Sequence, residues 1–165
     1  MAIPVYLWLY DDAGNLIKGS VDVRDRESSI EIICLNHCIE IPTDNANGKV
    51  TGTRIHSAFC VDKEVDSSSP YLYQALTTGK TLRLAELRFY NINDAGMEEH
   101  YFSVVMESVK VEAISSLMYD IKSDYGERCN HLECIELKYE KIKWHYLKGN
   151  IVHSDSWNER NTVAI

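Results

Sequence analysis

The segment Val5–Tyr10 is the feature that most narrows the folds open to this chain. Its aliphatic residues fall on every second position and its aromatic residues fall between them, so both faces of an extended strand would be apolar here. Such a strand needs cover on both sides. The turn-forming residues 11–15 follow it directly. We therefore predict a buried β-strand at 5–10, inside a fold made mainly of sheet.

Alternation with a period of two continues along the chain. It predicts further strands at about 18–24, 29–35, Thr53–Val61, Thr81–Ile92, Tyr101–Ile114 and Leu132–Tyr146. The last three change phase midway, which indicates β-bulges of the kind that turn strands around a barrel. In the stretch from 53 to 61, the alternation places His56 on the outward face.

One short helix is predicted at about 70–78. Ser67–Ser69 offers a serine cap, Pro70 suits the first helical position, and Gly79 suits a left-handed C-cap. The chain shows no alternation of strands with helices that would indicate a parallel sheet. The prediction is thus a single domain over 1–165. Its fold class is mainly β, an antiparallel β-barrel of two packed sheets with one short flanking α-helix, ending in a polar tail from about 148.

Charge and hydropathy exclude several classes of partner. The 17 basic residues are scattered among 25 acidic ones, for a net charge of −8, so we expect no nucleic-acid partner. The longest apolar stretch is much shorter than the roughly 20 residues of a membrane helix, so we expect no membrane partner. The N-terminus lacks the features of a secretory signal peptide, which predicts folding in the cytoplasm.

The residues indicate neither catalysis nor a cofactor. No nucleophile elbow, phosphate loop, dinucleotide fingerprint or zinc-protease motif is present. Glu98–His100 and His56 are interpreted as surface or interface groups. A zinc site would have to combine Cys34, His37 and Cys38 with Cys129, His131 and Cys134, at spacings that are irregular for a structural site. We therefore expect no metal, and we interpret the five cysteines, including Cys60, as free thiols.

Beyond these patterns, the residues themselves resemble the haemolysin-coregulated protein (Hcp) family, the tube and secreted component of bacterial type VI secretion. The resemblance covers nearly the whole chain, and it depends on the order and joint occurrence of short stretches. These are Lys18–Val21, Pro42–Asn45, Thr51–His56 with Phe59, Lys63, Asp66–Leu72 with Ala75 and Gly79, His131–Glu133, Ile135, Leu137, Tyr139–Ile142, Trp144 and His153–Trp157.

The resemblance implies a homo-hexameric ring that stacks into a tube, driven outward by a sheath beneath a spike on a baseplate. It implies a structural protein without enzymatic activity, present in the bacterial cytoplasm and then secreted, whose channel carries and protects small effector proteins. Three roles are hypotheses at the residue level. A polar projecting loop would reach the next ring through Pro42, Thr43, Asp44, Asn45, Asn47 and Lys49. Asn36, in a segment resembling the channel-facing part of the family, would contact cargo. Tyr6, Trp8 and Tyr10 would contact a neighbouring subunit.

Two other classes of function stay open on the sequence alone. A carbohydrate-binding β-sandwich would use exposed aromatic residues and loops rich in Asn and Asp, and would be a monomer or dimer. A zinc-dependent enzyme would use the Cys and His clusters.

Overall fold

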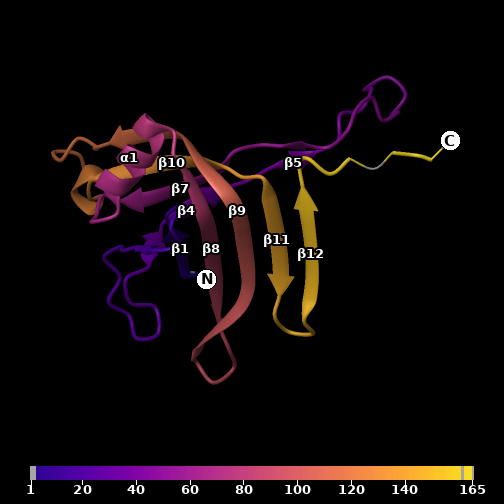
Figure 1. The fold of residues 1–165 in the computed structure, drawn as a ribbon. Coiled ribbons are helices and arrows are strands. Elements are labelled where there is room, and N and C mark those ends of the chain that lie inside the picture. Colours follow the sequence, from indigo (N-terminus) through magenta and orange to yellow (C-terminus); the bar gives the residue numbers. More distant parts are fainter. Residues whose placement is uncertain (1–2, 161, 165) are drawn as a thin grey trace.

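The structure is a computed structural model that describes residues 3–160 and 162–164, and Figure 1 shows their arrangement. The strands are β1 (Val5–Tyr10), β2 (Leu16–Ile17), β3 (Ile30–Ile32), β4 (Cys34–Asn36), β5 (Ile39–Glu40), β6 (Ile55–His56), β7 (Phe59–Glu64), β8 (Thr81–Ile92), β9 (Glu98–Leu117), β10 (Leu132–Lys138), β11 (Lys141–Tyr146) and β12 (Ile151–Ser156). The helices are α1 (Ser69–Thr78) and the 3-10 helix η1 (Gly126–Arg128). Among the described residues, none of the helices has the length and apolar character needed to cross a membrane.

A single antiparallel sheet of ten strands makes the body of the molecule, and β5 and β6 form a separate pair. The sheet follows the order β2-β1-β8-β9-β10-β7-β4, with β3 beside β1 and with β11 between β9 and β12. Strands β3 and β4 lie at opposite ends of this path but follow one another in the chain. Between them, the Ile33 N–H donates to the carbonyl of Asp62 at 2.8 Å.

The mainly β, antiparallel class with one flanking helix is confirmed, whereas the barrel of two packed sheets needs correction. The described ladders form one bent sheet, and its ends are joined by the chain at Ile33 instead of by a ladder. The physical reason is the 20-residue strand β9, which pairs with β8 along one edge and with both β10 and β11 along the other. Because β9 is continuous, the strands that were expected to form two packed sheets belong to one sheet.

The long strands change phase, as predicted, and two of their ladders contain bulges. Leu82 is buried in β8, and the buried phase then moves to Ala85 and Leu87. Across the ladder at this point lies Ser108, whose φ of 52° is unusual for a residue with a side chain, and the pairing of β8 with β9 keeps one register on both sides of it. Register shifts occur between Phe89 and Tyr90 and between Glu136 and Leu137. These bulges bend the sheet around its core.

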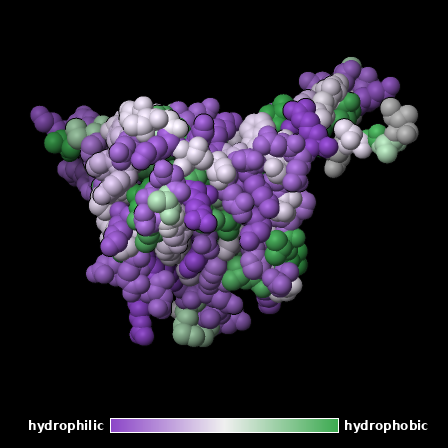
Figure 2. Space-filling view, viewed as in Figure 1, coloured by the Kyte–Doolittle hydropathy of each residue, from purple (hydrophilic) through white to green (hydrophobic). Residues whose placement is uncertain are grey.

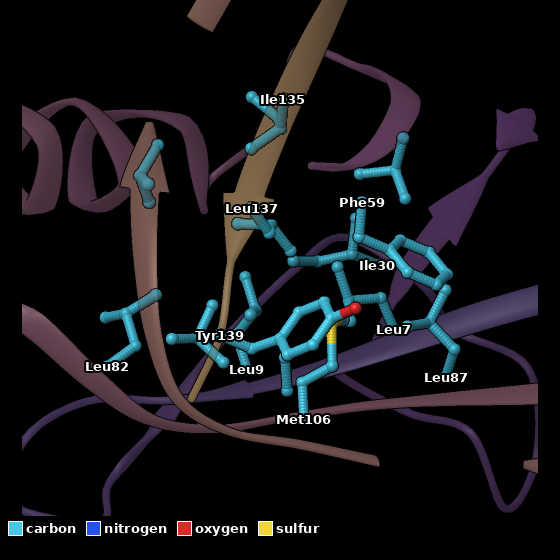
Figure 3. Packing of buried hydrophobic residues seen from close by; sticks show 14 of the residues in the cluster. Leu7, Leu9, Ile30, Phe59, Leu82, Leu87, Met106, Ile135, Leu137 and Tyr139 are labelled. Atoms are coloured by element: carbon cyan, nitrogen blue, oxygen red, sulfur yellow. The ribbon is translucent and has the colours of Figure 1, made fainter. Parts of the chain in front are cut away.

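The hydrophobic core fills the inside of this bend. Leu7 and Leu9 of β1 meet Leu87 of β8, Met106 of β9 and Leu137 of β10, and each is at most 2% exposed. Figure 3 shows these side chains converging from different strands, with the Tyr139 ring among them. Burial of each large aliphatic side chain stabilises the fold by roughly 1.5–3 kcal/mol. The core therefore joins strands from both halves of the sequence.

Helix α1 begins and ends where the sequence predicts, but its N-terminal cap differs. Gly79 has φ 67° and closes the helix in the left-handed conformation. Ser68 makes no side-chain cap; its own N–H donates to the Asp66 carboxylate at 2.9 Å. Leu72 and Ala75 are the buried face of the helix. The carboxylate of Asp66, rather than a serine hydroxyl, therefore organises the helix entry.

Four predicted strands are wrong or interrupted. The segment 29–35 divides at Ile33 into β3 and β4, and Leu132–Tyr146 divides at 139–140 into β10 and β11. The segment 18–24 is an irregular loop, in which Gly19 donates to the Ser28 carbonyl and Ser28 donates to Val21, both at 2.9 Å. The segment 53–61 breaks after His56, so that β6 leaves the body and pairs with β5, while β7 stays in the body sheet. Alternation of residue type could not reveal this break, since it continues in sequence across it.

The polar C-terminal tail expected from about 148 contains the strand β12. It pairs with β11 over its whole length, from Ile151 opposite Tyr146 to Ser156 opposite Lys141. Its sequence is polar because it lies at the edge of the sheet and has a solvated face, so it lacks the apolar alternation of a half-buried strand.

Residues 39–56, which we call the arm, project from the body. The arm consists of β5, β6 and the loop between them, and it extends to the upper right in Figure 1, on the same side as the C-terminal segment. An isolated bridge between Thr43 and Val50 extends its hairpin. The loop from 42 to 48 was predicted to project, and it does.

Candidate functional site: the arm and its base

The tip of the arm is built around Asp44. Its carboxylate accepts from the N–H of Ala46 at 2.8 Å and from the Asn47 amide at 3.1 Å, and its backbone N–H donates to the Lys49 carbonyl at 2.8 Å. The residues named for ring stacking therefore form one ordered turn at the far end of the arm. They are Pro42, Thr43, Asp44, Asn45, Asn47 and Lys49, and each is exposed except Pro42 and Asp44, which are of intermediate exposure.

Large aliphatic side chains along the arm lie open to solvent. Ile39 is 38% exposed, Ile41 54%, Ile55 47% and Val50 65%. Figure 2 shows hydrophobic atoms on the arm beyond the edge of the body, and others beside the lower half of β12, where Ile151 and Val152 are also exposed. Exposed aliphatic residues of this kind are common where one protein chain contacts another.

The base of the arm is fixed at the hydroxyl of Tyr139, which follows β10. The Nε2 of His37, before the arm, lies 2.8 Å from this oxygen, and the Nδ1 of His56, at the end of the arm, lies 2.6 Å from it. The other nitrogen of His56 lies 2.8 Å from the carboxylate of Asp155 in β12. Trp157 stacks on the His56 ring at 5.5 Å. Both chain segments at the base of the arm thus contact one hydroxyl group.

A bidentate ion pair adds to this anchor. The guanidinium of Arg54 donates to both oxygens of Asp155, at 2.5 and 2.8 Å, and to the backbone carbonyls of Ser156 and Glu159, each at 2.7 Å. Arginine suits this position because its planar fork matches a carboxylate. Asp155 therefore receives hydrogen bonds from two residues of the arm.

Burial and charge shift the pKa values of this group. The hydrogen bonds from Arg54, followed by that from His56, hold the pKa of Asp155 below its usual value, although burial opposes them. Burial lowers the pKa of His37, and the nearby charges of His56 and Lys138 lower it further. Burial, with the charge of Asp155, raises the pKa of Tyr139. At neutral pH the group consists of a charged carboxylate, a neutral phenol and an uncharged His37.

The prediction that His56 faces outward is wrong. Its side chain is 1% exposed, because the break after β6 turns it towards Tyr139 and Trp157 instead of into solvent. The partners come from positions 83 to 101 residues away. The sequence analysis did not predict this cluster. The polar residues 153–157 were the available signal, because a polar stretch that ends in tryptophan indicates partners elsewhere in the fold.

Asn36 lies on the exposed face of the body sheet, at the end of β4. In register, Asn36 pairs with Cys60 of β7, and Cys60 pairs with Glu136 of β10. The adjacent row is Cys34, Asp62 and Cys134. These alternating thiol, amide and carboxylate groups form an open polar surface.

The thiols on this surface are not alike. Burial, followed by a hydrogen bond to Asp62, raises the pKa of Cys134 to about 12. Burial, followed by the charge of Glu136, raises the pKa of Cys60. All five cysteines are free. Since the thiolate is the reactive species, Cys60 and Cys134 are poor nucleophiles at neutral pH.

The aromatic face of β1 is covered within the chain. Tyr6 and Trp8 are each 7% exposed. The Arg26 guanidinium lies 3.7 Å from the Tyr90 ring centroid and 5.0 Å from that of Tyr6, and Arg88 lies 4.3 Å above Trp8. The loop that carries Arg26 thus supplies the cover for which a neighbouring subunit was suggested, and Tyr10 is the more exposed of the three candidates.

A buried ion cluster fixes helix α1 to the sheet. The Lys63 ammonium lies 2.5 Å from the Glu133 carboxylate and 3.1 Å from that of Asp66, and it donates to the Ser69 hydroxyl at 3.2 Å. Ser69 in turn donates to Glu133 at 2.6 Å. Both Lys63 and Glu133 side chains are 1% exposed. The cluster joins β7, β10 and the start of the helix, so its role is structural.

The histidines and cysteines considered for zinc do not come together. Over the described parts of the chain, no group of three or more His, Cys, Asp or Glu side chains is placed to hold a metal ion. His131 instead lies 3.0 Å from the Ser116 hydroxyl, and His37 is engaged with Tyr139. Within the Glu98–His100 group, the Nε2 of His100 lies 2.8 Å from the hydroxyl of Ser103.

Comparison with known proteins agrees with this geometry. Residues 6–146 match the family model described as type VI secretion system effector, Hcp. A relative from Pseudomonas aeruginosa, named major exported protein, is 30% identical over 173 residues that span 99% of both chains. A solved structure of an Hcp1 variant from E. coli EAEC 042 is 58% identical, with a TM-score of 0.85 over 94% of this chain and 99% of that one. The secreted protein Hcp3 from P. aeruginosa is 26% identical, with a TM-score of 0.78 over 96% of this chain and all of that one.

Proposed function

Because the chain belongs to the Hcp family of type VI secretion system proteins, we propose that six copies close into a ring and that these rings stack into a tube. Family membership makes the chain a secreted structural subunit of that system's tube, and not an enzyme. The observation that carries this conclusion is the 58% identity to Hcp1, maintained over 94% of the chain with a TM-score of 0.85. The carbohydrate-binding reading has no support in these comparisons.

The arm supports the stacking part of the proposal. It places an ordered polar turn far from the body and leaves aliphatic side chains such as Ile41 and Val50 uncovered. A protein that folds with such a surface gains stability when a second copy covers it. The arm tip is therefore the proposed contact to the next ring, through the residues from Pro42 to Lys49.

The ring is tested by native mass in solution, together with negative-stain images of the same sample. Six chains of 18.9 kDa make about 113 kDa, as a closed cyclic assembly requires. A particle of that mass with a central hole is the expected result. A monomer at all concentrations, without rings under crowding, would remove the tube from consideration.

The stacking role is tested by Asp44→Ala, which removes the carboxylate that organises the arm tip. We expect rings of unchanged mass and fewer or shorter stacks in electron micrographs. Asp11→Ala is the matched control, because Asp11 organises the turn after β1 in the same way, accepting from Ala13 and Asn15 at 3.0 and 2.8 Å. Stacks that survive Asp44→Ala, or that fail equally in both variants, would contradict the role of the arm.

The exposed face of β4, β7 and β10 is the proposed channel wall, with Asn36 as a cargo contact. The support is its open polar surface, which suits a protein cargo that must leave again. In this proposal the chain folds in the cytoplasm, carries small effector proteins, and meets the spike, sheath and baseplate on export. A side-chain-resolution reconstruction of the tube tests it, and Asn36 on the outer wall would refute it.

The interface between neighbouring subunits of the ring is proposed to include Tyr10. Of the three aromatic residues considered, Tyr6 and Trp8 are buried beneath arginines of the same chain, whereas Tyr10 keeps exposed surface. Tyr10→Ser is expected to weaken the ring in native mass measurements without unfolding the chain.

A further inference from the structure

The hydrogen-bonded chain of side chains at the base of the arm, which we call the relay, contains two imidazoles that can each accept a further proton. It runs from His37 through the Tyr139 hydroxyl to His56 and ends at Asp155, with separations of 2.8, 2.6 and 2.8 Å. A phenol has one hydrogen to donate, and each imidazole has two nitrogens whose roles depend on its protonation state. The number of protons in the relay therefore decides whether every contact can be a hydrogen bond.

With both imidazoles neutral, every contact is satisfied. The His56 Nε2–H donates to Asp155, and its Nδ1 accepts from the Tyr139 hydroxyl, whose oxygen accepts from the His37 Nε2–H. With one added proton on His56, both of its nitrogens donate. The Tyr139 hydroxyl then turns to donate to His37, whose Nε2 becomes the acceptor. The relay reverses its direction and stays complete.

A second proton breaks this arrangement. Both imidazoles would then point N–H groups at the Tyr139 oxygen, and its own hydrogen would have no acceptor within the relay. A buried polar group without a partner is costly, and so are two like charges at this separation. Tyr139 is 4% exposed, so water does not replace the lost bond without opening the site.

The surrounding charges make the doubly protonated state worse. The Lys138 ammonium approaches the His56 carbonyl at 3.4 Å and stands over the Trp157 ring, adding positive charge beside the relay. The negative charge of Asp155 is already paired with Arg54, which also feels the more distant Glu159. His37 packs on the apolar ring of Phe59 at 4.8 Å. One paired carboxylate thus faces three potential cations in addition to Arg54.

The position of the two histidines connects this chemistry to the arm. His37 precedes β5 and His56 ends β6, so they are on the two chain segments that enter and leave the arm. We propose that the relay is an acid-sensitive latch, which holds the base of the arm with no added proton or with one, and releases it when both imidazoles are charged. The latch itself stands on the geometry of one chain. Its consequence, that stacked rings separate in acid, rests on the proposed function of the arm.

The direction of the pH effect follows from His37. Its pKa is lowered in the folded chain, so the unfolded chain binds the proton more readily. The stabilisation is complete above the usual histidine pKa and is lost as pH falls through the lowered value. Asp155 acts in the same direction at still lower pH, because its pKa is also lowered from the usual carboxylate value. Acid therefore weakens the base of the arm.

Hydrogen exchange of the assembled full-length chain tests the latch between about pH 7.5 and about pH 4.5, a range that spans histidine titration. Protection factors correct for the pH dependence of intrinsic exchange. We expect the protection of the β5–β6 amides to fall about tenfold or more, a change typical of local opening. The amides of the β8–β9 ladder serve as the internal reference and should keep their protection. Equal protection of the arm at both pH values would overturn the proposal.

His37→Gln separates the latch from general acid effects. Glutamine can donate to or accept from the Tyr139 hydroxyl but does not titrate, so the arm should stay protected at both pH values. The matched control is His131→Gln, since His131 contacts Ser116 outside the relay; this variant should lose arm protection in acid as the unmodified chain does. A full acid response in His37→Gln, or its loss in His131→Gln, would contradict the latch.

A second variant keeps the test decisive if His37→Gln folds poorly. Tyr139→Phe removes the shared hydroxyl, and the arm should then exchange rapidly at both pH values. Native mass distinguishes this inference from the proposed function: a chain that forms no rings could still show the latch, and a stacked tube with a pH-independent arm would refute the latch alone.

Discussion

The body sheet and the arm bury their aliphatic side chains to very different extents. In the body, Leu87 and Met106 are wholly closed off from solvent, whereas Ile41 and Val50 in the arm are 54% and 65% exposed. A side chain in the core has neighbours on several strands, so many weak contacts hold it. The arm has no core of its own, and the polar groups at its base hold it in place. Its position therefore depends on few atoms, which makes it easier to move and easier to control.

Each region also contains one buried polar cluster, and these two clusters differ. Lys63 and Glu133 pair an ammonium with a carboxylate, both 1% exposed, and fix a helix within the body. The Tyr139 relay contains a neutral phenol and an uncharged His37 beside a single carboxylate, and it joins the arm to β12. A cluster of paired charges resists opening because each partner would be left desolvated and alone, while the hydrogen bond between the uncharged His37 and the Tyr139 phenol opens at lower cost.

The largest effect is expected for Lys63→Ala in the body. It leaves Glu133 buried without its cation, which costs about 3–5 kcal/mol in the free energy of unfolding. Urea denaturation measures the loss. The double variant Lys63→Met with Glu133→Leu is the control, because removal of both charges should restore much of the stability. A single variant as stable as the parent would show that this region opens to water.

Truncation of core and arm side chains sharpens the contrast. Leu87→Ala leaves a cavity in the core and should cost about 2–5 kcal/mol. Ile41→Ala removes a similar number of atoms from the exposed arm and should change the free energy of unfolding by no more than about 0.5 kcal/mol. The same denaturation experiment, at a concentration where rings do not stack, measures both. A large cost for Ile41→Ala would mean that the arm packs on the body in solution.

A smaller effect is expected for Tyr139→Phe at the boundary between the two regions. Loss of the hydroxyl leaves the buried Nδ1 of His56 without a partner, at a cost of about 1–3 kcal/mol. Much of this cost should fall on the arm alone, so exchange of the β5–β6 amides should rise more than exchange of the β8–β9 amides. Equal changes in both would show that arm and body open as one unit.

The last prediction concerns the reactivity of a thiol in the body, measured by alkylation, and involves no change in stability. Because burial and Asp62 raise the pKa of Cys134 to about 12, its thiolate is scarce near neutral pH. Alkylation of Cys134 in the native chain should be at least about a hundredfold slower than in the urea-unfolded chain, given how reactivity follows thiolate content. Peptide mass spectrometry measures the two rates. Comparable rates would show that the exposed face of β10 opens readily.

The body could largely be predicted from the sequence, since its strands carry local signals. Thr81–Ile92 begins and ends as predicted for β8, and its buried residues change phase between Leu82 and Ala85, as predicted. Helix α1 follows from Pro70 and Gly79. These features depend on residues close together in the sequence, where periodicity and turn chemistry operate.

The candidate site at the base of the arm could not be predicted in the same way. His56 alternates with apolar neighbours and was assigned outward, but its environment is made by Tyr139, Asp155 and Trp157, far along the chain. The polar strand β12 was missed for a related reason: an edge strand needs no apolar face. Both errors concern polar groups whose partners are set by tertiary structure, whereas the projection of the 42–48 loop was correct because nothing apolar in it could reach the core.

The position of β1 in the sheet has a consequence for synthesis of the chain on the ribosome. Val5 pairs with Phe89, and Tyr10 pairs with Leu84, so the first strand finds its main partner only after more than half of the chain has emerged. At a translation rate of about 5–20 residues per second, this two-sided apolar strand waits for seconds before β8 can pair with it, although β2 and β3 emerge earlier. Contacts between such distant positions also slow the final folding step. During that interval the nascent chain exposes the uncharged apolar segment Val5–Tyr10, and we expect a chaperone to bind there.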